Sequence, residues 1–301
     1  STALPANAPE ALCPTCVLSR AAERPPGRER AVRSLEKLGR REEARALVEV
    51  MVTAPRDESE RVFSEKRLAG KRLAPSRRAF EEWTIEVEPG SDPIELRTLE
   101  ALRAKGYEGA FAENALWRSL FGLTFWEEIW APVAGAFAHP FQYGPLDLHD
   151  DWRVRREPAI TEKLQRLAEE AKPGERLLDL WRSKHGTASS LVFFPPESFP
   201  ALQLAGGTLQ GKHLAPIFDR LSRDLSRYGS GFPDLFLIAP DGLPAVAEVK
   251  GPNDVLRPEQ IGWLEHFAAS GLRAAVIHSR PVATEGNPLE TPRRAPGPQS
   301  S

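Results

Sequence analysis

The stretch GFPDLFLIAPDGLPAVAEVKGPND, residues 231–254, contains two short apolar runs on either side of an Asp-Gly turn. The runs DLFLIA and PAVAEVK have the length and composition of β-strands, and PDGL is typical of a hairpin connection. Asp234 begins the first run, and Glu248 and Lys250 end the second. Because side chains alternate along a strand, Glu248 and Lys250 project from the same face.

The neighbouring segments place this hairpin in a larger core. Residues 214–229 predict an amphipathic helix, residues 257–271 a second helix that starts at a proline, and residues 273–280 a last strand. SSLVFFPP, residues 189–196, is a possible additional strand. The order helix, strand, strand, helix, strand predicts an α+β or mixed α/β fold with a mixed sheet.

Helices are expected before this core. Residues 28–70 predict three short amphipathic helices that are similar to a tetratricopeptide-type pair, although a single copy cannot establish a solenoid. A short strand is expected in WTIEVEPGSDP, and helix over 94–130 with a stop at Gly106. The second part of that helix is apolar almost all round and is therefore expected to be buried. Glu113 starts it, either to complement the helix dipole or to point at a partner.

Composition limits the class of protein. The chain has 301 residues, 41% of them hydrophobic, which suffices for one large or two medium domains. Its formal net charge is −2, so DNA binding would require a local basic patch. No apolar run approaches the roughly 20 residues that span a bilayer, so no membrane partner is expected.

Two cysteines, Cys13 and Cys16, form one CPTC motif. They are too few for a disulfide framework and favour an intracellular protein: cytoplasm or nucleoid in a bacterium, nucleus in a eukaryote. The pair is half of a zinc site at most, and a structural or incidental role is favoured. The only methionine is Met51 and the chain begins with Ser1, so we expect a piece of a longer protein.

The acidic residues of the hairpin suggest metal chemistry. If the hairpin pairs as its turn indicates, Asp234 lies beside Glu248, and the main-chain carbonyl of Val249 completes an all-oxygen site that suits Mg²⁺ or Mn²⁺. Lys250 would position a water and offset charge on a phosphorane-like transition state. A bare Glu-x-Lys triplet occurs by chance, so a noncatalytic hairpin with an exposed cross-strand pair remains an alternative.

Two separated stretches carry a resemblance to a known family. Residues 231–279, with EVKGPND followed by a helix containing Gln, Trp and Leu, resemble the VRR-NUC domain of the Fanconi-associated nucleases, a branch of the PD-(D/E)xK superfamily. YEGAFAENALWRSLFGLTFWEEIW together with FQYGPLDL is similar to the helical segment that the family sets before its nuclease domain. The resemblance covers roughly residues 95–280 and favours a member of the bacterial type.

The resemblance implies a restriction-endonuclease-like core of order α-β-β-β-α-β, preceded by an all-helical tetratricopeptide-like region. It implies Glu113, Asp234 and Glu248 as ligands of one or two Mg²⁺ or Mn²⁺ ions, with Lys250 as the catalytic lysine. Gln142 falls where the family has a glutamine lining the site. The other candidate substrate contacts are cationic: Arg118, Arg223, Arg227 and Arg257.

The implied organisation has five parts: a linker at 1–27, a helical region at 28–93, a helical segment at 94–187 that contributes Glu113, the nuclease domain at 188–282, and a disordered tail at 283–301. The helical region is a possible surface for a protein partner. Where some relatives hold basic residues after GPND, this chain has Val255 and Glu259, which puts recognition of a 5′ phosphate in doubt.

The implied activity is a structure-specific DNase that cuts near 5′ flaps, trims 5′ to 3′, and acts in interstrand-crosslink repair on branched or 5′-flap duplex DNA. Two alternatives remain. One is a Holliday-junction-resolving or restriction-like nuclease with the same core. The other is a noncatalytic DNA-binding scaffold, against which the retention of four candidate catalytic residues argues.

Overall fold

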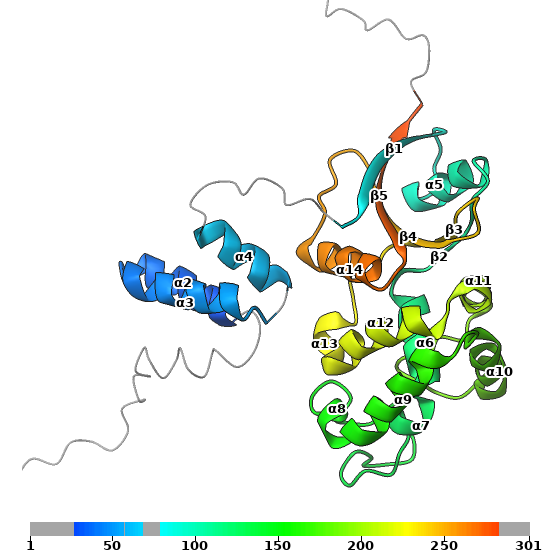
Figure 1. The fold of residues 1–301 in the computed structure, drawn as a ribbon, viewed down its shortest axis with the longest axis horizontal. Helices are drawn as coiled ribbons and strands as arrows, with labels where there is room; N and C mark the ends of the chain where they lie inside the picture. The colour runs from blue at the N-terminus through cyan, green and yellow to red at the C-terminus, as the bar shows by residue number, and fades with distance from the viewer. Residues whose placement is uncertain (1–26, 57, 69–78, 283–301) are drawn as a thin grey trace, which may run out of the picture.

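The computed structural model describes residues 27–56, 58–68 and 79–282 (Figure 1). The expected linker up to residue 26, the CPTC cysteines and the expected tail at 283–301 lie outside the described residues. Among the described helices, none is both long and apolar enough to cross a bilayer.

One mixed sheet organises the core. Its strands are β1 Glu81–Val87, β2 Glu108–Phe111, β3 Leu235–Ile238, β4 Pro244–Lys250 and β5 Arg273–Pro281, in the spatial order β1-β5-β4-β3-β2. β5 is parallel to both β1 and β4, whereas β3 is antiparallel to both β4 and β2. The predicted mixed sheet and the hairpin of β3 and β4 are confirmed.

Two helices that contact the sheet complete the expected order. Helix α5 Ile94–Arg103 precedes β2, and helix α14 Pro258–Ala269 connects β4 to β5. The series α5, β2, β3, β4, α14, β5 therefore follows the expected α-β-β-β-α-β order. It is interrupted between β2 and β3 by a helical insertion, seen below the sheet in Figure 1.

The pleat of β4 divides its side chains between two cores. Val246 belongs to the large core that includes Trp263 and Phe267 of α14. Ala247 and Val249 belong to a smaller core on the α5 side of the sheet. Since alternate residues of a strand share a face, Glu248 and Lys250 lie on the α14 side.

The helical insertion forms most of the large core. Its helices are α6 Glu113–Thr124, α7 Trp126–Ile129, α8 Trp152–Arg155, α9 Glu157–Glu169, α10 Gly174–Lys184, α11 Phe199–Thr208, α12 Gly211–Arg223 and α13 Leu225–Tyr228, with a 3₁₀ turn at Pro196–Ser198. Trp117 and Phe121 of α6 are fully buried, and Trp117 lies 4.5 Å from the Phe267 ring of α14. The prediction that α6 is a buried helix is confirmed, and its packing fixes it against the sheet.

Three local predictions were wrong. β2 occupies part of the segment that was expected to be helical, because its residues pair with β3. Residues 189–196 form no strand, since side-chain hydroxyls take their backbone N–H groups: Ser189 Oγ accepts from Leu191 and Val192, and Ser119 Oγ from Phe193. The helix expected over 214–229 breaks at Asp224, which caps α13 through the N–H of Arg227.

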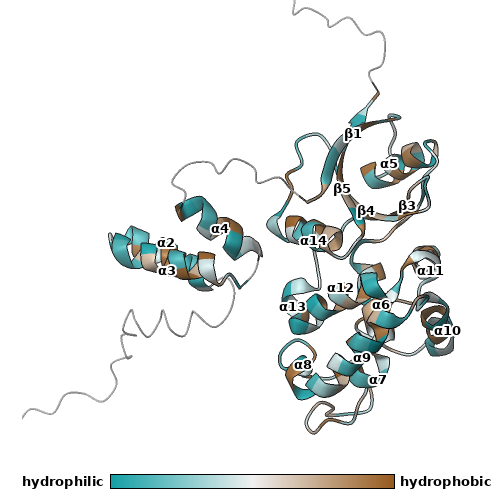
Figure 2. Cartoon of the chain, viewed as in Figure 1, coloured by the Kyte–Doolittle hydropathy of each residue, from teal (hydrophilic) through white to brown (hydrophobic). Residues whose placement is uncertain are grey.

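The expected N-terminal helices are present as α2 Gly27–Lys37, α3 Arg41–Thr53 and α4 Glu58–Leu68. They enclose a small core of their own and carry polar and apolar residues side by side, as amphipathic helices do (Figure 2). Arg28 and Glu60 form a buried ion pair within it. Helix α4 contacts α14, where Arg61 lies 3.5 Å from Glu265.

The sheet also crosses the expected segment boundaries. β1 comes from the 28–93 region, β2 from the 94–187 segment, and β3 to β5 from 188–282. β1 joins the sheet of the 188–282 segment because it pairs in parallel with β5. The strands of the three segments are therefore hydrogen-bonded into one sheet.

Candidate active site

The β3–β4 hairpin sets Asp234 beside the end of β4. Leu235 pairs with Ala247, so Asp234, one residue earlier, reaches the level of Glu248 and Val249. The Asp234 Oδ2 atom accepts a hydrogen bond of 2.8 Å from the backbone N–H of Val249. The predicted convergence of Asp234 on the Glu-x-Lys segment is therefore present, and the side chain of Val249 points into the opposite core.

Glu248 and Lys250 form a buried pair on the α14 side of the sheet. The Nζ of Lys250 lies 2.8 Å from Glu248 Oε1, and the side chains of Glu248 and Lys250 are only 2% and 10% exposed. The alternative of an exposed cross-strand pair is therefore wrong. Burial of two charges is costly unless they are paired and hydrogen-bonded, which is the arrangement found here.

Gln260, in the first turn of α14, completes this cluster. Its Nε2 donates to Glu248 Oε1, and its Oε1 accepts from Lys250 Nζ at 3.2 Å and from the backbone N–H of Arg257 at 3.0 Å. Sequence reasoning missed Gln260 as a site residue. The signal available for it was its position in the helix that follows the EVKGPND segment.

Glu248 retains one buried oxygen without a partner. Oε1 accepts from both Lys250 and Gln260, whereas Oε2 is buried and makes no hydrogen bond. Burial, with the neighbouring charge of Asp234, raises the pKa of Glu248 to about 7, although Lys250 opposes the shift. An unsatisfied carboxylate oxygen of this kind is a feature of a site that binds a cation.

Asp234 is perturbed in the same direction. Burial raises its pKa to about 6, against the hydrogen bond from Val249, which lowers it. The negative charges of Glu95 and Glu113 raise it further. Glu95 lies in the first turn of α5, and no local sequence signal indicated that it would approach the site.

Glu113 is positioned by the end of β2. Phe111 pairs with Leu235, and the chain then turns so that the backbone N–H groups of Ala112 and Glu113 both face the carbonyl oxygen of Asp234, at 2.8 and 3.3 Å. Glu113 adopts a positive φ of 36°, a strained conformation for a non-glycine residue. Its backbone is thus held beside Asp234 at the entrance of α6.

The environment of Glu113 differs from the expectation. Its helix is buried, but Glu113 itself is exposed, because it is the first residue of the helix and faces solvent. Burial therefore does not force its carboxylate to find a partner. Its negative charge raises the pKa of Asp234, but less than burial and the charge of Glu95 do.

The GPND turn after Lys250 is also strained. Asn253 has a φ of 71°, and Asp254 Oδ2 accepts a 2.9 Å hydrogen bond from the N–H of Gly251. Within the described ranges, Asn253 and Glu113 are the non-glycine residues with positive φ. Strained backbone concentrates at functional sites, and here Glu113 follows β2 beside Asp234 while Asn253 lies three residues after Lys250.

The residues present fit a hard divalent cation. Asp234 and Glu248 are side by side, both pKa values are raised, and a buried oxygen of Glu248 is available as a ligand. In the described part of the chain no three His, Cys, Asp or Glu side chains already form a complete metal site. Glu113 is exposed at the start of α6 and is not part of such a cluster, so its role as a third ligand stays a prediction.

The arginines that were predicted to contact the substrate differ in their surroundings. Arg257 is exposed at the start of α14, and its charge lowers the pKa of Glu248 against the larger effect of burial, which places it near the site. Arg118 is half-buried and donates a 2.9 Å hydrogen bond to the carbonyl oxygen of Ser190, so it supports a loop of the insertion. Arg223 is exposed and paired with Asp219.

The remaining two candidates are held by local contacts. Arg227 lies over the ring of Tyr228 and lines a cavity of about 100 Å³ near the start of α14. The side chain of Gln142 accepts from the N–H groups of Ala138 and His139, and donates to the carbonyl oxygens of Ala136 and Gly144. These bonds run to the backbone of its own loop and brace it.

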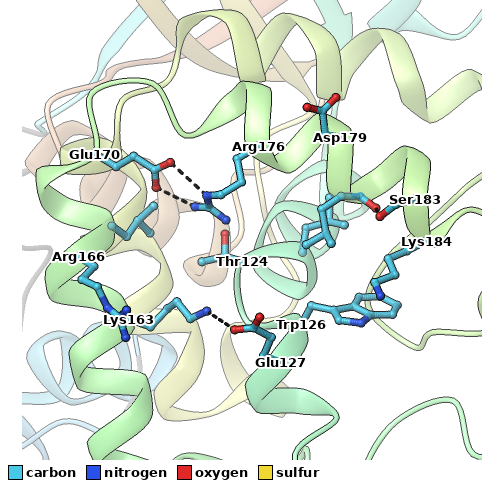
Figure 3. A pocket seen from close by; sticks show the side chains of 13 residues that line it. Thr124, Trp126, Glu127, Lys163, Arg166, Glu170, Arg176, Asp179, Ser183 and Lys184 are labelled. Atoms are coloured by element: carbon cyan, nitrogen blue, oxygen red, sulfur yellow. Dashed lines mark hydrogen bonds and ion pairs between the residues drawn. The ribbon is translucent and has the colours of Figure 1, made fainter.

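A cavity of about 770 Å³ lies at the opposite end of α6 from Glu113 (Figure 3). Four of its charged groups are paired with one another: Lys163 contacts Glu127 at 3.1 Å, and Arg176 contacts Glu170 at 2.7 Å. None of the candidate catalytic residues lines it. The candidate catalytic residues therefore lie in the β4–α14 cluster and not at this cavity.

Comparison with known proteins agrees with this location. The VRR-NUC domain family matches residues 168–281, which include Asp234, Glu248, Lys250 and Gln260. These residues are therefore a VRR-NUC domain, which contains strands β3 to β5 and helix α14. The chain is, more particularly, a homologue of the Fanconi-associated nucleases.

Three similarities support this assignment. The Fanconi-associated nuclease 1 homolog of Pseudomonas aeruginosa is 35% identical over 277 residues, covering 87% of this chain and 49% of that protein. Human Fanconi-associated nuclease 1 is 28% identical over 72% of this chain and 23% of its own length. The crystal structure of paFAN1 bound to 2nt 5′flap DNA with gap superposes with a TM-score of 0.75 and 33% identity, over 87% of this chain and 50% of that one. The chain thus spans about half the length of the Pseudomonas relative.

Proposed function

We propose that this chain is the catalytic portion of a Mg²⁺- or Mn²⁺-dependent, structure-specific DNA nuclease with a PD-(D/E)xK core. The observation that carries the proposal is the buried, unpartnered Oε2 of Glu248 beside Asp234, with Lys250 fixed on the other oxygen. That arrangement supports hydrolysis of a phosphodiester and has no evident structural purpose. Oε2 of Glu128 and Oδ1 of Asp147 are also buried without a partner, so the distinguishing feature of Glu248 is its combination with Asp234 and Lys250.

The proposed ligands are Asp234, Glu248 and the main-chain carbonyl of Val249, with Glu113 joining them when the charges are neutralised. A divalent ion bound there would polarise a nonbridging phosphate oxygen and lower the pKa of a bound water. The chain's own residues supply the remaining functions. Lys250, held by Glu248 and Gln260, presents a fixed positive charge to the attacked phosphate and the entering water.

The proposed substrate is duplex DNA with a 5′ flap or a related branch, cut near the flap and trimmed 5′ to 3′, as part of interstrand-crosslink repair. The solved relative was crystallised with such a flap. Arg257 is the proposed backbone contact nearest the site, because it is exposed beside the carboxylate cluster. Gln142, Arg118, Arg223 and Arg227 remain proposed substrate contacts at greater distance. Helices α2 to α4 are a proposed surface for a protein partner.

The direct test compares the wild-type protein with Asp234→Ala. Both are incubated with an end-labelled 5′-flap duplex and Mn²⁺, and with Holliday junctions, 3′ flaps and linear duplexes of the same sequence. We expect the wild type to cut the 5′ flap in preference, and Asp234→Ala to lose at least about 100-fold in rate, as removal of a metal ligand should. Equal cutting by both proteins would refute the proposal. Glu100→Gln, an exposed change on α5, is the matched control.

A further inference from the structure

The contacts of Gln260 carry an inference that rests on the proposed function and extends it. We propose that Gln260 is a positioning residue that selects which oxygen of Glu248 faces the metal. Gln260 is 4% exposed and touches both members of the Glu248–Lys250 pair. It lies on α14, whereas the pair lies on β4, so it links the helix to the catalytic strand.

The orientation of the Gln260 amide is determined by chemistry. The backbone N–H of Arg257 and the ammonium group of Lys250 can only donate, so both must face Oε1 of the amide. The NH₂ group then necessarily faces Glu248, where it donates to Oε1. Rotating the amide by 180° would set donors against donors and leave Glu248 with one fewer hydrogen bond.

This fixed amide leaves the two oxygens of Glu248 unequal. Oε1 receives hydrogen bonds from Lys250 and Gln260, whereas Oε2 receives none and is buried. Without the Gln260 donor, the carboxylate is free to rotate and to share Lys250 between its oxygens. Gln260 therefore helps to keep the hydrogen bonds on Oε1 and leaves Oε2 available to a cation.

Helix α14 gives the amide its rigidity. Gln260 occupies the first turn and accepts from the N–H of Arg257, while Trp263 and Phe267 anchor the same helix in the large core. A glutamine at this helix position also serves as an ordinary cap. A cap would affect stability alone, so metal affinity and kcat distinguish the two roles.

The test uses Gln260→Met, which keeps the side-chain length and removes the amide, and Gln260→Asn, which keeps the amide but withdraws it by one methylene. Gln210→Ala is the matched control, because Gln210 precedes helix α12 as a capping residue. Each protein is measured for Mn²⁺ affinity by calorimetry, for kcat and KM on a 5′-flap duplex, and for thermal stability.

We expect both Gln260 variants to bind Mn²⁺ more weakly and to lose about 10- to 100-fold in kcat with KM unchanged, the range typical of groups that orient metal ligands. Gln210→Ala should lower stability only. Gln260 variants with wild-type metal affinity and kcat would overturn the inference, and Gln260→Asn provides this test if the methionine variant does not fold. A wild-type protein that neither binds Mn²⁺ nor cuts DNA would instead refute the proposed function.

Discussion

Replacing Glu248 by glutamine should stabilise the metal-free protein while abolishing metal binding. The folded-state pKa of Glu248 is about 7, compared with an ordinary value of 4.5. At 1.36 kcal/mol for each unit, keeping the carboxylate ionised in the fold costs about 3 kcal/mol at pH 8. Glutamine removes that cost but places an unpaired N–H where Oε2 was, which costs about 1 to 2 kcal/mol.

The net gain of Glu248→Gln is therefore about 1 to 2 kcal/mol at pH 8, or roughly 4 °C in Tm for a domain of this size. The direction of the pH dependence follows from the linkage between protonation and folding. Because the folded pKa is raised, the wild type loses stability as the pH rises from 4.5 to 7, whereas glutamine does not titrate. The difference should thus change sign: near pH 4 only the cost of the unpaired N–H remains and Glu248→Gln is about 1 to 2 kcal/mol less stable than the wild type, whereas its advantage reaches full size above pH 7.

The assay is thermal melting in EDTA from pH 4.5 to 8.5, with Glu100→Gln as an exposed control. In Mn²⁺ at 100 times its Kd the wild type alone should gain about 2.7 kcal/mol, so the order of the two melting temperatures should reverse. A Glu248→Gln protein that melts below the wild type in EDTA at pH 8, or a difference that does not change with pH, would refute the reasoning.

Three other outcomes are expected. The pKa values of Asp234 and Glu248 are about 6 and about 7, so binding of Mn²⁺ should release about one proton per ion at pH 6 and close to none at pH 9. Calorimetry in buffers of different ionisation enthalpy measures the release, and equal release at both pH values would contradict this prediction. Gly174→Ala should lower the free energy of urea unfolding by about 3 kcal/mol, because the new Cβ would lie 1.7 Å from the carbonyl oxygen of Gly206. Gly207→Ala is the control, because its Cβ meets open space, and similar losses in the two variants would contradict the close contact of Gly174 with Gly206. Glu60→Ala should lower the free energy of unfolding by about 3 to 5 kcal/mol, because it removes the ion-pair partner of buried Arg28. Hydrogen exchange should accelerate in α2 to α4 but not in the sheet, and unchanged exchange in α2 to α4 would disprove this prediction.

Local patterns predicted the elements that have strong periodicity. The hairpin of β3 and β4, helix α14 and strand β5 follow one another within about 50 residues, and their turn, proline and glycine signals are in the sequence. β2 was missed because four residues pair with β3 across more than 120 positions of chain. The run at 189–196 was misassigned because an apolar segment held by serine hydroxyls has the composition of a strand.

Some features of the candidate site were likewise predictable from the sequence, and others depended on the tertiary structure. Glu248 and Lys250 share a face because the pleat requires it, and Asp234 reaches them because the hairpin aligns the strands. The exposure of Glu113 and the approach of Glu95 depend on how two helix starts pack against the sheet. Neither was accessible to an argument from spacing.

The amino-acid sequence by itself determined which side chains are present at the end of β4 and on which face of the strand they lie, since alternation is a property of the backbone. Only the tertiary structure decided their protonation and their hydrogen bonds. Burial under α14 raises the pKa of Glu248, and Gln260 occupies one of its oxygens while the other remains unpartnered. Desolvation and hydrogen-bond partners arise from segments brought together by folding, and for this reason they cannot be read from the residues around Glu248.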